Sequence, residues 1–168
     1  MKISFKNKIG KGLFSTAYLQ ENNTVVLKSV DPIKECMSFG WFPESNFFPK
    51  IEHIDFELYS MKYYPKVKSL KKSLTPKHWD IYKELRKLDI GIVDNRYNYL
   101  DSWREEFKKV TNKTVKNALI EAVEACANYG SDVRFEISPR NVAVSKTGKL
   151  ILLDCFFIQS KADQVRTK

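Results

Sequence analysis

The chain is poor in the residues that build disulfide-stapled or metal-bound domains. Its 168 residues include three cysteines and two histidines. The cysteines are odd in number and far apart, which predicts neither a disulfide framework nor a zinc site and favours a reducing cytoplasm. No apolar run approaches the roughly 18 residues that a membrane span needs. The first residues, MKISFKNKIGKG, lack the apolar core of a signal peptide, so none is expected.

Hydrophobic residues and positive charge are well represented instead. Hydrophobic residues make up 43% of the chain, which suffices for a core in one domain or in two small lobes that share a cleft. Lys and Arg number 29 against 20 Asp and Glu, giving a formal net charge of +9. This excess favours anionic partners such as nucleotide phosphates, nucleic acid or an acidic protein surface. A solvated basic surface would explain the charge equally well.

The first half of the chain has the composition of an antiparallel sheet with one helix. Asp31 followed by a proline predicts the start of a short helix, and an irregular aromatic stretch follows it. Residues rich in β-branched and aromatic types, bounded by turn signals, predict the strands. The strands are expected at residues 3–9, 16–20, 24–28, 51–56 and 58–64, and the helix at 32–39.

The second half changes to helical spacing. Apolar residues recur every three or four positions in segments that begin near residue 75 and that span about 99–110 and 114–129. A strand hairpin is expected at 142–144 and 150–153, and a polar tail at 160–168. This order predicts an α+β fold of two lobes, with an antiparallel sheet lobe at 1–65 and a reduced helical lobe at 66–168.

Residues 9–18, IGKGLFSTAY, place two glycines before an aromatic and a small residue between two expected strands. Because Gly10 and Gly12 carry no Cβ atom, their backbone can approach a phosphate chain closely, and Phe14 can cover the ligand. The segment is neither a Walker loop nor a Rossmann turn, since no GK[ST] follows and the next element is a strand. A Gly-Lys-Gly bend is also common in plain hairpin turns.

Three later segments contain polar residues that could bind phosphate, accept a proton or hold a metal ion. Lys28 follows an apolar strand and can hold phosphate oxygens, unless it is an ordinary exposed lysine. Glu136 and Asn141 stand five positions apart, where the acid can accept a hydroxyl proton and the amide oxygen can bind magnesium. Asp154 follows another apolar strand, and a carboxylate there needs a partner or a metal. We expect Lys28, Asn141 and Asp154 to converge on one triphosphate.

In this order and spacing the four segments resemble the protein-kinase signature set. Residues 10–17 resemble the glycine-rich loop, and Lys28 the phosphate-binding lysine. Residues 136–141 have the spacing of the catalytic loop, and 154–156 stand where the metal-binding DFG motif would be. Met61 falls near the gatekeeper position, and residues 62–65 resemble the hinge. The resemblance covers roughly residues 5–157.

The resemblance implies ATP and Mg²⁺ as cofactors, with Glu136 and Lys28 as catalytic residues and Asn141 and Asp154 as metal ligands. Among protein kinases, this sequence most resembles the short serine/threonine kinases encoded by bacteriophages. Such a kinase would act in the host cytoplasm on host proteins, such as transcription machinery. The implied nucleotide-binding residues are Gly10, Gly12, Phe14, Ser15, Lys28, Met61, Tyr63, Asn141 and Asp154.

The sequence departs from the kinase pattern in several places. Glu136 stands where the catalytic acid is usually Asp, which displaces the carboxylate by about an ångström, a shift that can cost about 100-fold in rate. The His-Arg pair that usually precedes this acid is replaced by residues 134–135, RF. Almost nothing follows residue 157 to form an activation segment. The glutamate expected to pair with Lys28 is Glu35 or Glu44, with Glu35 favoured.

These departures leave other functions open. The chain is expected to be an active phosphotransferase on Ser or Thr of proteins, or a pseudokinase that serves as a protein-binding or inhibitor module. A small-molecule kinase is a further alternative. A basic nucleic-acid-binding domain is a secondary alternative, because lysines cluster at residues 66–72 near Tyr63 and Tyr64, which could stack on bases.

Overall fold

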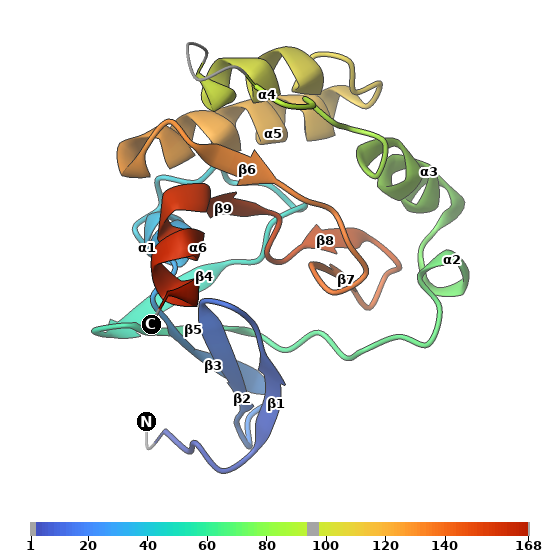
Figure 1. Ribbon diagram of the computed structural model, residues 1–168. Helices are drawn as coiled ribbons and strands as arrows, with labels where there is room; N and C mark the ends of the chain where they lie inside the picture. The colour runs from blue at the N-terminus through green and yellow to red at the C-terminus, as the bar shows by residue number, and fades with distance from the viewer. Residues whose placement is uncertain (1–2, 94–97, 168) are drawn as a thin grey trace.

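The computed structural model describes residues 3–93 and 98–167 (Figure 1). An antiparallel sheet of five strands, in the order β1-β2-β3-β5-β4, lies at one end of the molecule, and helices α4 and α5 lie at the other. Between them lie α1, α6 and two small sheets. The strands of the large sheet are β1 (Lys8–Lys11), β2 (Ser15–Leu19), β3 (Thr24–Ser29), β4 (Ile51–Asp55) and β5 (Leu58–Lys62).

The register of the large sheet decides which side chains face the rest of the molecule. Leu27 of β3 lies opposite Ala17 of β2 and Tyr59 of β5. Residues that lie opposite one another share a face of a sheet, and successive residues of one strand alternate between faces. Because Leu27 and Tyr59 belong to the main hydrophobic core, this is the inner face. Lys28 therefore lies on the outer face.

Helix α1 (Pro32–Ser38) begins where the sequence predicts. The Asp31 carboxylate accepts a hydrogen bond of 2.9 Å from the Ile33 N–H, and a proline stands at the first helical position. These features satisfy a free backbone donor and fix the backbone at the helix start. The helix contacts β4, β9 and α5. It therefore joins the sheet lobe to the helical lobe.

The helical lobe contains the three long helices that the sequence predicts. Each begins at a residue whose side chain accepts a hydrogen bond from the first turn, namely Thr75, Asn98 or Asn112. Phe107 is fully buried, and its ring lies 5.5 Å from that of Trp103 and 5.0 Å from that of Phe135. The helices are α2 (Leu70–Ser73), α3 (Pro76–Leu85), α4 (Tyr99–Phe107) and α5 (Lys113–Cys126), followed by the 3₁₀ turn η1 (Ala127–Tyr129).

Two small sheets complete this lobe. The predicted hairpin is confirmed as β7 (Val142–Val144) paired with β8 (Leu150–Leu152), and it turns at Gly148, whose φ is +73°. The other sheet joins β6 (Val133–Phe135) to β9 (Phe156–Ile158). Most of the expected polar tail forms a helix, α6 (Gln159–Arg166), which buries Ala162 and contacts β9.

The order and pairing of these elements confirm the predicted fold class, an α+β chain with an antiparallel sheet lobe and a reduced helical lobe. The three cysteines are buried and free. In the described ranges, no helix is long and apolar enough to cross a bilayer.

Candidate functional site

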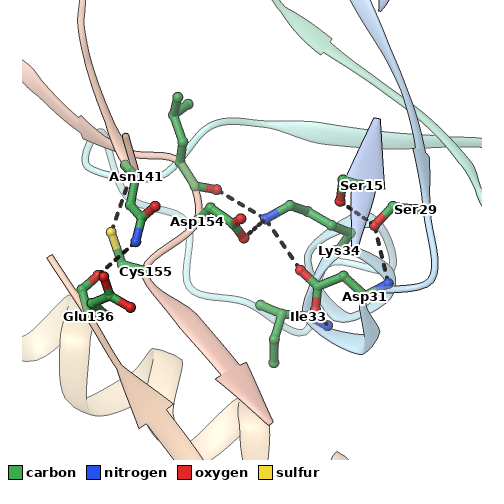
Figure 2. Close-up of polar contacts among 10 residues, drawn as sticks. Ser15, Ser29, Asp31, Ile33, Lys34, Glu136, Asn141, Asp154 and Cys155 are labelled. Carbon is green, nitrogen blue, oxygen red and sulfur yellow. Dashed lines mark hydrogen bonds and ion pairs between the residues drawn. The ribbon is translucent and has the colours of Figure 1, made fainter. Parts of the chain in front are cut away.

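Asn141 and Asp154 lie side by side at the base of the β7–β8 hairpin. The backbone carbonyl of Asn141 accepts hydrogen bonds from the N–H groups of Leu153 at 2.8 Å and Asp154 at 3.2 Å. The Asn141 side-chain nitrogen donates to the Glu136 carbonyl at 3.4 Å. Figure 2 shows Glu136 and Asn141 next to each other, with Asp154 nearby. The structure thus brings together three of the residues predicted for the site.

Lys34, which the sequence analysis did not single out, reaches this group from helix α1 (Figure 2). Its ammonium nitrogen lies 2.8 Å from Asp154 Oδ1 and donates to the Leu153 carbonyl at 3.1 Å. It also lies 3.6 Å from Asp31 Oδ2. The side chain of Lys34 is only 5% exposed, while that of Asp154 is 47% exposed. Three oxygens therefore surround a buried ammonium that has three N–H groups to donate.

The charges of this cluster influence one another strongly. Burial alone would lower the pKa of Lys34, but the carboxylates of Asp154 and Asp31 raise it above its ordinary value. Burial raises the pKa of Asp31 from 3.8 to about 6, although Lys34 and the Ile33 N–H oppose the shift. Above that pH the cluster holds one ammonium and two carboxylates. It then carries one net negative charge.

Lys28 does not join this group. It is exposed on β3, opposite Thr16 and Leu58 on the outer face of the sheet. The next residue, Ser29, is 1% exposed, and its hydroxyl lies 2.6 Å from that of Ser15 and accepts a hydrogen bond from the Asp31 N–H. Of the three residues expected to converge, the structure brings together Asn141 and Asp154.

The glycine-containing segment forms a tight turn between β1 and β2. The Gly12 N–H donates to the Ser15 carbonyl at 2.8 Å, and the Val30 N–H donates to the Phe14 carbonyl at 3.1 Å. The turn is therefore tied to the end of β3. A Cβ atom added at Gly10 or Gly12 would find its nearest contact at 4.0 or 3.8 Å, and neither residue has a positive φ. Neither the backbone nor the packing requires glycine at these two positions.

Met61 and Tyr63 follow the path of the predicted hinge. Met61 lies on β5 opposite Val25 and Ile51, on the inner face, and is partly buried against the core. The Tyr63 N–H donates to the carbonyl of Asn23 at 3.3 Å. That amide is therefore already used inside the sheet lobe, and any adenine held here would need other backbone groups.

The two glutamates expected as partners of Lys28, Glu35 and Glu44, lie apart from it. Glu35 follows Lys34 on α1, and burial first, and then the negative charge of Glu35, raises the pKa of the Tyr129 phenol. Glu44 is exposed in the irregular segment after α1. Lys34 did not stand out in the sequence, because Glu35 beside it in the first turn of α1 is also charged.

Cys155 has a structural place beside the site. Its thiol is buried and donates to the Asn141 carbonyl at 3.4 Å. Burial raises the pKa of this thiol well above its ordinary value, since the thiolate would be poorly solvated. The Cys155 carbonyl also accepts a hydrogen bond of 2.8 Å from the Glu136 N–H. Cys155 therefore holds the two loops together and is not an activated nucleophile.

Two of the solved structures that are similar to this chain serve as examples. No family model matches the sequence, and no curated protein matches it. One structure is a ternary complex of streptomycin, ATP and APH(2")-IIa, with a TM-score of 0.40 and 16% identity over 88% of this chain and 65% of that chain. The other is an apo pseudokinase, with a TM-score of 0.40 and 11% identity over 91% of this chain and 57% of that chain. The chain spans less than two thirds of either.

Proposed function

We propose that this chain is an ATP- and magnesium-dependent phosphotransferase, a minimal serine/threonine protein kinase of the phage type. The observation that carries the proposal is the meeting of Asn141, Asp154 and Glu136 at the junction of the two lobes. These are two oxygen ligands for a hard cation beside one free acid, the minimum that the chemistry needs. The glycines at positions 10 and 12, which the fold itself does not require, add support.

The donor set at this junction fits a magnesium ion that is shared with a nucleotide. In residues 3–93 and 98–167, no cluster of three or more His, Cys, Asp or Glu side chains could hold a metal by itself. The side-chain oxygens of Asn141 and Asp154 would hold the ion, and phosphate oxygens would supply other ligands. When bound, the metal neutralises charge that develops on the phosphates.

The residues of the chain would divide the remaining tasks. Glu136 is exposed and anchored by its backbone, so its carboxylate can accept the proton of an incoming hydroxyl. The turn at residues 12–15 would lie over the phosphates. The net charge of +9 favours a protein acceptor with an acidic surface, such as part of the host transcription machinery.

The direct test is transfer of radiolabelled phosphate from ATP to the chain itself and to proteins of a host lysate. We expect transfer by the wild type and its loss in Asp154→Asn and Asn141→Ala. Asp80→Asn is the matched control, because Asp80 is an exposed carboxylate on α3 that pairs with a surface lysine. Absence of transfer by the wild type, or equal transfer by Asp154→Asn, would contradict the proposal.

A second candidate, a pseudokinase that acts as a binding module, is favoured by one specific observation. Lys34 already neutralises Asp154, and Lys28 points away from it. This function predicts a partner that wild type and Asp154→Asn retain equally well. It fails if Asp154→Asn removes the biological effect while the complex with the partner is unchanged.

A further inference from the structure

We infer that Lys34 of helix α1, rather than Lys28 of strand β3, is the lysine that holds the nucleotide phosphates. The inference rests on the proposed nucleotide site and names the cation of that site. It places the phosphate-binding charge on the helix that joins the lobes.

Lys34 lies close to the expected metal ligand Asp154. The Lys34 ammonium lies 2.8 Å from Asp154 Oδ1. Magnesium binds its oxygen ligands at about 2.0–2.1 Å. A phosphate oxygen that shares such an ion with Asp154 therefore lies within about 7 Å of the Lys34 nitrogen. The flexible lysine side chain can close this gap and form a charge-assisted hydrogen bond. Lys28 has no comparable position, since it extends from the opposite face of β3.

The register of the large sheet keeps Lys28 on the outer face. The inner-face position that follows Leu27 belongs to Ser29, which is buried and bonded to Ser15. To turn Lys28 inward, β3 would have to slip by one residue against both neighbours. A slip of one residue moves every side chain to the other face, so Val25 and Leu27 would leave the core. The sheet therefore excludes Lys28 from the inner face.

A second acid, Asp31, is buried next to Lys34. Asp31 is 2% exposed and caps α1, and its Oδ2 atom lies 3.6 Å from the Lys34 ammonium without a hydrogen bond of its own. When a cation takes Asp154, Lys34 still keeps Asp31 and the Leu153 carbonyl as partners. One N–H group is then released toward a phosphate. Asp31 thus holds the ammonium in place in both states.

The charge of the cluster also predicts what it will bind. With Asp31 and Asp154 ionised, one ammonium does not balance two carboxylates. A free nucleotide anion is therefore repelled strongly, while its complex with a divalent cation carries less negative charge and brings the cation to Asp154, so it is repelled less. We expect ATP with magnesium to bind much more tightly than ATP with a chelator.

Calorimetric titration of four proteins with ATP and with adenosine, both in magnesium, tests the inference. We expect Lys28→Met to bind ATP within twofold of the wild type, and Lys34→Met to bind it at least tenfold more weakly. Because Lys34→Met leaves Asp31 buried without its counter-charge, the double variant Lys34→Met with Asp31→Asn provides a second, charge-matched protein. Its circular dichroism spectrum checks the fold.

Adenosine separates the phosphate contact from a structural role, because it carries no phosphate. The double variant should bind adenosine as the wild type does and lose affinity for ATP only. Tight ATP binding by the double variant, or a loss confined to Lys28→Met, overturns the inference and leaves the nucleotide site standing. A wild type that binds neither ligand overturns the nucleotide site, and the inference with it.

Discussion

Replacing Asp31 by Asn should change how stability depends on pH. Burial raises the pKa of this carboxyl from 3.8 to about 6. Between these values the folded chain keeps a proton that the unfolded chain releases. Since the folded state then binds more protons, the free energy of unfolding falls as pH rises through this window. The stabilisation from the protonated acid is fully present below pH 3.8 and is lost as pH passes about 6.

The size of the effect follows from the shift. About two pH units at about 1.36 kcal/mol each give about 3 kcal/mol. Asn keeps a side-chain oxygen that can accept the Ile33 N–H, so Asp31→Asn preserves the helix cap while it removes the titration. Because part of this change falls below pH 4, the stability of Asp31→Asn relative to the wild type should rise by about 2–2.5 kcal/mol between pH 4 and pH 7.

Urea unfolding followed by circular dichroism at pH 4, 5, 6 and 7 measures this difference. Asp80→Asn is the control, because this exposed carboxylate should change stability by less than about 0.5 kcal/mol at every pH. The reasoning is refuted if the difference between wild type and Asp31→Asn is the same at all four values, or if it changes in the opposite direction.

Three further changes test the site and the fold. Glu136→Gln should lower the rate of phosphate transfer about 100-fold or more, because it removes the acid that accepts the hydroxyl proton; an unchanged rate would exclude that role. Phe107→Ala should cost about 3–5 kcal/mol in urea unfolding, since the ring is fully buried among other aromatic rings, and a cost below about 1 kcal/mol would be incompatible with this core. Gly148→Ala should destabilise the β7–β8 hairpin by about 1–2 kcal/mol, because φ is +73° and a Cβ atom would lie 3.1 Å from Thr75 Cγ2; an unchanged melting temperature would argue against that turn.

Much of the fold could be predicted because local signals mark its elements. Asp31 before a proline marks the start of α1, and Gly148 marks the turn of the β7–β8 hairpin. Helix α6 gave no such signal, since Ala162 is its single buried residue and the others are polar or partly exposed. Strands β6 and β9 are only three residues each and pair across a long stretch of chain.

The candidate site could be predicted in part for a similar reason. Asn141 and Asp154 flank a hairpin that the sequence marks clearly, so their proximity follows from local structure. The face occupied by Lys28 could not be predicted, because the residues before it form a continuous apolar run without alternation. Lys34 owes its burial to Asp154, which lies 120 positions away in the sequence. Such a pair is visible only once the chain is folded.

The most direct test of the nucleotide site is a thermal shift with ATP and magnesium compared with magnesium alone. A ligand that binds only the folded state stabilises it by about 2.7 kcal/mol at 100 times its dissociation constant. We predict a clear rise in melting temperature for the wild type and for Asp80→Asn, and none for Asp154→Asn. Equal melting of the wild type with and without ATP, or an equal rise in Asp154→Asn, would contradict the account.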